Sequence, residues 1–104
     1  MKIVRVVYTT KAAYAAQNKT NIQKVMSDLQ AINNSDIEYT CCVGEDGKTF
    51  THLAFFKSPE AEKVLLTLPA FKTFQEQLKA SGPEKPPMQD FPELVGSSYK
   101  MFGK

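Results

Sequence analysis

The hydrophobic and polar positions of this chain follow two different periods, and their order predicts a mixed fold of strands and helices. Residues 2–10 (KIVRVVYTT) are mostly β-branched or aromatic, which is typical of a central strand. Between Ala12 and Ile32 the apolar residues recur at helical spacing among Asn, Gln, Lys and Asp, which predicts an amphipathic helix. The polar run Asn33-Asn34-Ser35 suits the turn that ends this helix.

A β-hairpin is predicted next. Residues 36–43 (DIEYTCCV) and 48–57 (KTFTHLAFFK) both have strand character, and residues 44–47 (GEDG) supply a turn between them. The two segments are therefore expected to pair as neighbouring antiparallel strands.

The second half of the chain is predicted to hold an interrupted helix and one last strand. Ser58-Pro59-Glu60 has the residues of a helix start, and Pro69 cannot lie inside a helix without removing a hydrogen bond. We therefore expect a break just before Pro69 and a fresh helix to about Ala80. Residues 81–92 contain four of the six prolines and are expected to form a connecting loop, which leaves 93–102 as the final strand.

The order β-α-β-β-α-β predicts an α+β, ferredoxin-like fold. Right-handed crossovers place the four antiparallel strands in the order 4-1-3-2, with both helices on one face of the sheet. A chain of 104 residues is too short for two cores, so residues 1–104 are expected to form a single domain. The other face of the sheet is left uncovered.

The third predicted strand is apolar on both of its faces. Phe50, Ala54 and Phe56 alternate with Leu53 and Phe55, although a half-buried strand normally alternates apolar with polar residues. Two helices can cover only one face, so the open face is expected to meet the same face of a second copy of the chain. The sequence therefore predicts a homodimer.

Two segments resemble a known family. Residues 53–61 (LAFFKSPEA) and 68–74 (LPAFKTF) are similar to the dimeric α/β-barrel superfamily, in particular its antibiotic-biosynthesis-monooxygenase-like branch. The resemblance implies that two ferredoxin-like chains pair their sheets into a barrel with a cavity in each protomer. It also implies activity without a cofactor on a small aromatic or quinol-like molecule, because such oxygenases belong to this branch.

Two main functions stay open, with haem binding through His52 as a third possibility. Members of the branch often carry a Glu followed by a Trp on the third strand and a His in the next helix, whereas this chain has Ala54 and Phe56 on that strand and no Trp. The first function is a monooxygenase-like enzyme. The alternative is a non-catalytic dimer that binds a ligand or serves in a stress response.

The candidate site depends on which residues face the interior of the barrel. Successive residues of a strand point to opposite faces. If Val4, Val6 and Tyr8 face the helices together with Leu53 and Phe55, the alternate residues of these strands therefore face the interior of the barrel. The expected interior set is His52 and Arg5 as catalytic residues, with Phe50, Phe56, Glu38 and Ser98 as substrate-binding residues.

His52 and Arg5 carry the expected chemistry, each with a structural alternative. The only histidine could exchange protons near neutral pH as a general acid or base, or it could be a buried neutral imidazole bonded to a neighbouring strand. Arg5 could hold an anionic or enolate oxygen, or it could form an ion pair with Glu38. Tyr14, Tyr39 and Tyr99 could donate to a ligand oxygen, although aromatic residues at these spacings also suit a core.

Charge and composition exclude several other classes. The net charge of +2 comes without a basic stripe, so no nucleic-acid partner is expected. The apolar run 3–8 is too short for a signal peptide or a membrane span, which predicts a cytoplasmic protein. Cys41 and Cys42 are adjacent on a predicted strand and are expected to be two small buried or half-buried thiols, with a vicinal disulfide or redox pair as the alternative. No spacing typical of a metal site is present.

Overall fold

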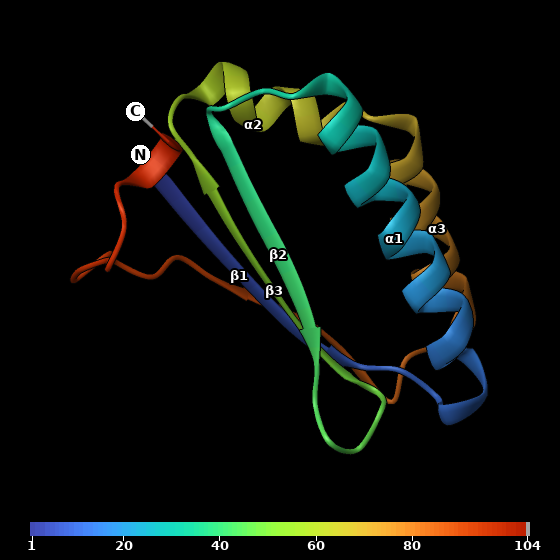
Figure 1. Ribbon diagram of the computed structural model, residues 1–104. Coiled ribbons are helices and arrows are strands. Elements are labelled where there is room, and N and C mark those ends of the chain that lie inside the picture. Colours follow the sequence, from blue (N-terminus) through green and yellow to red (C-terminus); the bar gives the residue numbers. More distant parts are fainter. Residues whose placement is uncertain (104) are drawn as a thin grey trace.

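A computed structural model describes residues 1–103 and shows one sheet with helices on one side of it (Figure 1). Two short 3-10 helices, Ala12–Tyr14 and Met101–Gly103, flank the main elements. The main elements are β1 (Lys2–Thr9), α1 (Ala15–Ile32), β2 (Ile37–Val43), β3 (Thr49–Phe56), α2 (Pro59–Leu66), α3 (Pro69–Ser81) and β4 (Lys85–Asp90).

The sheet has the predicted topology. Its strands lie in the order β2-β3-β1-β4, which is the order 4-1-3-2 read from the other edge, and all three pairings are antiparallel. The helices α1, α2 and α3 lie together on one face (Figure 1). The ferredoxin-like α+β fold is thus confirmed, and the pairing of two chains into a barrel stays a prediction.

The ends of the helices follow from local sequence. The Ser58 hydroxyl caps α2 by accepting a hydrogen bond from the Ala61 backbone N–H at 3.2 Å, and Pro59 occupies the first turn. The predicted break falls between Leu66 and Pro69, where α2 ends and α3 begins. At the end of α1, Asn33 takes a left-handed conformation with φ of 55°.

The last strand lies earlier than predicted. β4 is formed by Lys85–Asp90, which lie within the expected loop. In the segment 93–102, expected to be the strand, residues 93–100 form neither helix nor strand and the last two begin a 3-10 helix. The reason is that β4 is an edge strand paired only with β1. Prolines such as Pro86 and Pro87 are tolerated at an edge because half of its backbone groups have no partner strand.

The core fills the layer between the sheet and the helices. Phenylalanines from β3 and α3 and aliphatic residues from α1, α2 and α3 are buried there, among them Phe50, Phe56, Val25, Leu65, Phe74 and Leu78. Cys41 and Cys42 are free thiols, as predicted; Cys41 is half-buried, whereas Cys42 is exposed and not buried as expected. Among residues 1–103, no helix combines the length and the apolar character that crossing a membrane requires.

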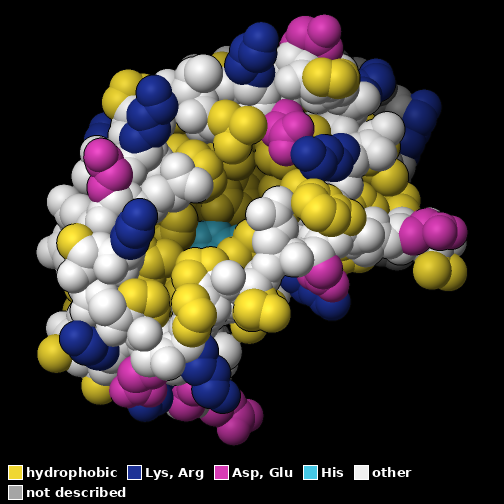
Figure 2. All heavy atoms as spheres, turned by 180° about the vertical axis from the view of Figure 1, so that it is seen from behind, with side chains coloured by type: hydrophobic (Ala, Val, Ile, Leu, Met, Phe, Trp, Pro, Cys, Tyr) yellow, Lys and Arg dark blue, Asp and Glu magenta, His cyan; other side chains and the backbone are white. Residues whose placement is uncertain are grey.

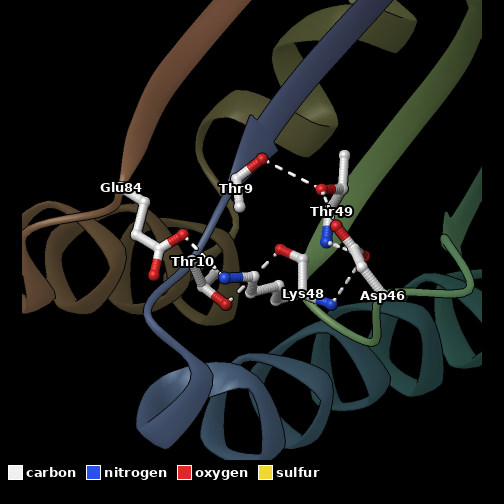
Figure 3. Close-up of polar contacts among 6 residues, drawn as sticks. All are labelled: Thr9, Thr10, Asp46, Lys48, Thr49 and Glu84. Carbon is white, nitrogen blue, oxygen red and sulfur yellow. Dashed lines mark hydrogen bonds and ion pairs between the residues drawn. The ribbon is translucent and has the colours of Figure 1, made fainter.

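A polar network closes the hairpin and ties it to β1 and to the start of β4 (Figure 3). The Asp46 carboxylate accepts the backbone N–H groups of Lys48 and Thr49 at 3.0 and 2.9 Å and the Thr49 hydroxyl at 2.5 Å. Lys48 Nζ forms an ion pair with Glu84 Oε1 at 2.9 Å, and the backbone oxygen of Lys48 accepts the Thr10 N–H at 2.9 Å. The hydrogen bonds that Asp46 accepts from Thr49 and Lys48 favour its ionised carboxylate and lower the pKa of Asp46 to about 2.

We expect the hairpin turn to depend on the ionised form of Asp46. Its stabilising contribution should be complete above the ordinary pKa of 3.8 and should disappear as the pH falls through about 2. Asp46→Ala should therefore lower the midpoint of thermal unfolding at pH 7, whereas Glu45→Ala should not. The carboxyl carbon shift of Asp46, followed by NMR against pH, gives the pKa directly, and an ordinary value would contradict this account.

Candidate functional site

The register of β1 and β3 decides which residues share a face of the sheet. Val6 lies opposite His52, and Arg5 lies opposite Leu53. Directly opposed residues of antiparallel strands point to the same face, so His52 faces the helices with Val6 while Arg5 faces the open side. The predicted face assignment is therefore right for β1, whose Arg5 was expected on the open side. It is wrong for β3, where it turned Leu53 toward the helices and His52 toward the open side.

Arg5 makes its ion pair on the open face with Asp90 of β4. Its Nε lies 3.0 Å from Asp90 Oδ1, and its Nη2 lies 2.5 Å from Asp90 Oδ2. This bidentate pair lowers the pKa of the Asp90 carboxyl. The expected partner was Glu38, but that carboxylate accepts the backbone N–H of Phe102 instead. The prediction missed Asp90 because it lay in the segment expected to be a loop.

The expected substrate-binding residues are scattered. Phe50 is buried beneath Tyr8, with ring centroids 5.5 Å apart and an interplanar angle of 13°. Phe56 is buried on the helix face and lines a small cavity. Ser98 is exposed in the segment that follows β4. Of the six residues expected in one site, only His52 and Phe56 line the cavities between the sheet and α2 and α3.

A cavity of about 400 Å³ lies between the sheet and α3, within the usual size of small-molecule sites. Figure 2 shows a hollow with hydrophobic walls and the histidine side chain at its floor. Phe71, Phe74 and Leu78 of α3 line it. Its exposed residues are Gln75, Lys79, Pro86 and Pro87. The imidazole of a buried strand is thus reachable from solvent.

A second cavity of about 150 Å³ adjoins the first. The residues that line both include Val6, Tyr39, His52, Phe71 and Gln75. The two spaces therefore meet at Tyr39 and His52. A ligand longer than a single ring could lie across both cavities, with its middle over this pair.

The polar centre of the cavity is a chain of four side chains from four elements. His52 Nε2 lies 2.8 Å from the Tyr8 hydroxyl, and His52 Nδ1 lies 2.6 Å from the Tyr39 hydroxyl. Asn18 of α1 donates from its Nδ2 to the Tyr8 hydroxyl at 2.8 Å. Asn18 is 0% exposed and His52 is 5% exposed, so the chain is held in the core.

Burial determines the protonation states in this chain. It lowers the pKa of His52 to about 4 and raises the pKa of both Tyr8 and Tyr39. At neutral pH the site therefore holds a neutral imidazole between two protonated phenols. It can exchange hydrogen bonds with a ligand without carrying a charge of its own. Within residues 1–103, no group of three or more His, Cys, Asp or Glu side chains is placed to hold a metal ion.

Sequence reasoning missed two members of the chain and saw a third only as a weak candidate. Tyr8 was assigned to the core and Asn18 was not considered, while Tyr39 was one of three possible ligand donors. A signal for Asn18 was available, because it lies four residues from both Tyr14 and Ile22 on the apolar side of α1. A polar side chain at such a position requires a buried partner.

We expect His52 to titrate well below neutral pH. Its folded-state pKa of about 4 lies under the ordinary value of 6.5, so the unfolded chain binds more protons between these limits. The stabilising contribution should be complete above pH 6.5 and lost as the pH falls toward 4, with a total of about 3 kcal/mol.

The ring protons of His52, the only histidine, give its pKa by NMR without overlap. Denaturant unfolding at several pH values gives the free energy, and His52→Gln should remove the slope between pH 4 and 6.5 that the wild type shows. A titration midpoint near 6.5 would show that the imidazole is not buried as described.

Comparison with known proteins bears on the fold. No protein-family model matches the sequence, and no curated protein matches it either. Among solved structures, this chain is similar to an antibiotic biosynthesis monooxygenase, with a TM-score of 0.74 and 10% identity over 92% of this chain and 100% of the other. It is also similar to Rv0793 from Mycobacterium tuberculosis, with a TM-score of 0.75 and 10% identity over 94% and 98% of the two chains.

A third similar structure is SnoaB from Streptomyces nogalater, described as a cofactor-independent oxygenase. Its TM-score is 0.65, with 12% identity over 95% of this chain and 96% of the other. At such identities the likeness establishes a shared ferredoxin-like fold over nearly the whole chain. The chemistry has to be argued from the residues of this site.

Proposed function

We propose that this protein, which has the fold of the antibiotic biosynthesis monooxygenases, binds a small planar aromatic molecule between its sheet and α3 and oxygenates it without a cofactor. The observation that carries the proposal is the imidazole–phenol chain at the floor of an apolar cavity reachable from solvent. Flat hydrophobic walls suit an aromatic ring, and the polar floor suits one oxygen substituent on that ring.

Oxygenation without a cofactor requires that the substrate itself supply the electrons to dioxygen. An electron-rich phenol or enol can do so once it is ionised. For an anthrone-type ring, both C–H bonds of the central CH2 break and that carbon becomes a carbonyl. One oxygen atom of O2 stays on the carbon, and the other leaves as water with the two hydrogens. The carbon loses four electrons and O2 gains four, so no external reductant is needed.

The described contacts support a role for each part of the cavity. The Tyr39 hydroxyl, held by His52 at 2.6 Å, is the group we assign to the substrate oxygen. Phe71 and Phe74 would pack on the ring, while His52 acts through Tyr39 because both of its nitrogens are already bonded. Arg5 has no role in this proposal, since it lies on the opposite face of the sheet.

We expect Tyr39→Phe to slow oxygenation of a dihydroxyanthrone roughly 100-fold, because removal of one preorganised donor costs about this much. Oxygen uptake and the absorbance of the quinone product measure the rate, and one O2 should be consumed per product without build-up of peroxide. Tyr99→Phe is the matched control, since Tyr99 is 60% exposed and does not line this cavity. Equal rates in the two variants would contradict the role of Tyr39.

Binding without turnover is the second candidate, and the state of His52 favours it. A neutral imidazole whose two nitrogens both bond to tyrosines offers no free base. If the wild type binds the anthrone but consumes O2 no faster than buffer does, the protein is a ligand-binding protein. Faster uptake excludes this candidate.

We also propose that the protein is a homodimer joined through the open face of the sheet. Val7, Leu53 and Phe55 lie half-buried on this face with no helix over them. Met88 and Phe91, at the adjoining edge, are 72% and 63% exposed. A second copy of the sheet would remove this apolar surface from water.

Light scattering after size exclusion should therefore give twice the 11.6 kDa mass of the chain. Leu53→Glu should weaken the dimer by roughly 100-fold or more, because it places an unpaired carboxylate in the interface. Thr73→Glu introduces the same charge on the exposed side of α3 and should leave the dimer intact. A wild-type monomer at micromolar concentration would contradict the proposal.

A further inference from the structure

We infer that Asn18 is a positioning residue that fixes the tautomer of His52, so that the Tyr39 hydroxyl presents its proton to the cavity. The oxygen that the site recognises would then be a hydrogen-bond acceptor, either a carbonyl or an oxygen anion. Only the identity of the ligand rests on the proposed function. The tautomer itself follows from the contacts of the four side chains.

The row of hydrogen bonds begins at the buried amide of Asn18. Its Nδ2 donates to the Tyr8 hydroxyl at 2.8 Å, while its Oδ1 is buried without a hydrogen-bond partner in residues 1–103. The amide thus acts on Tyr8 as a donor. Because it comes from α1 and is 0% exposed, no water competes for this contact.

The direction passes from Tyr8 to His52. A phenol has one proton, and the Tyr8 oxygen already accepts from Asn18. Its other partner is His52 Nε2 at 2.8 Å, so Tyr8 donates its proton to that nitrogen. A neutral imidazole carries one N–H, and a bond accepted at Nε2 leaves this proton on Nδ1.

The chain ends at Tyr39. His52 Nδ1–H donates to the Tyr39 oxygen at 2.6 Å, and this is the hydrogen bond that the Tyr39 hydroxyl makes within residues 1–103. Its own proton is therefore available to the cavities that Tyr39 lines. All donors in the chain point the same way, and such chains strengthen the last donor by polarisation.

The opposite arrangement would select a different ligand. If Asn18 accepted from Tyr8, then His52 Nε2–H would donate to Tyr8 and Tyr39 would donate to Nδ1. Tyr39 would then offer the cavity only a lone pair, and it would accept a hydrogen bond from the hydroxyl of a neutral phenol. The orientation of one buried amide therefore decides whether the site stabilises the ionised or the neutral form of a phenol.

A single histidine makes the tautomer directly measurable. In the unliganded protein labelled with 15N-histidine, long-range 1H–15N spectra at pH 7 should show Nδ1 as the protonated nitrogen and Nε2 as the unprotonated one. The reverse pattern, or averaging between the two tautomers, overturns the inference. This measurement needs neither a ligand nor turnover, so it is independent of the proposed function.

Substitutions test whether Asn18 is the cause. Asn18→Asp, at a pH where the new carboxylate is ionised and can only accept, should move the proton to Nε2, and Asn18→Leu should remove the preference for Nδ1. Asn21→Leu, on the same helix but bonded to Gln77 and Tyr14, should leave the tautomer unchanged. If both Asn18 variants keep the wild-type pattern, Asn18 does not fix the tautomer. Should they fail to fold, Tyr8→Phe breaks the same link, and an unchanged pattern there overturns the inference.

The ligand part has a separate readout. Naphthol bound to the wild type should ionise at least tenfold more readily than naphthol bound to Tyr39→Phe, as followed by absorbance against pH, because both cavities desolvate the ligand and only the wild type donates to its oxygen. Naphthol that ionises equally or less readily in the wild type overturns the donor role of Tyr39. Absence of binding contradicts the proposed aromatic ligand, while the tautomer measurement still decides the positioning role of Asn18.

Discussion

The antiparallel pairing of β1 with β3 determines which side chains meet in the layer between the sheet and the helices. It places Val6 opposite His52 and Tyr8 opposite Phe50, all on the face covered by the helices. A shift of β3 by one residue would turn His52 and Phe50 to the open face. The cavity, the buried imidazole and the separation of His52 from Arg5 all follow from this register.

Placing polar groups in this layer is costly unless each of them is hydrogen-bonded. The imidazole of His52 meets this requirement through two phenols, and one of these phenols is bonded in turn to Asn18. The exception is the Asn18 carbonyl oxygen, which is buried without a partner in residues 1–103. An unsatisfied group beside an otherwise complete chain is consistent with a role in function, because stability alone would favour an apolar residue there.

The helices and the edge strand give the cavity its walls and its opening. The break before Pro69 separates α3 from α2, and α3 then brings Phe71, Phe74 and Leu78 over the sheet. On the other side, Pro86 and Pro87 of β4 line the cavity from an edge that pairs only with β1. This frame is shared with structures at about 10% identity, whereas the His52 chain is described from the residues of this protein.

The sequence by itself determined the elements, their order and the topology, because periodicity and local signals such as Ser58-Pro59 act over a few residues. The sequence-based prediction misplaced β4 because prolines are acceptable in a strand only at the edge of a sheet. Which strand lies at the edge depends on how the whole sheet is assembled. The prediction also assigned His52 to the wrong face, although it placed Arg5 on the correct one. Alternation shows which residues of one strand share a face, but it does not show which face of the next strand lies beside them. Asn18 contacts Tyr8 only after α1 packs on the sheet. The tertiary structure decided these contacts, because they join residues that are distant along the chain and that come together only in the packed fold.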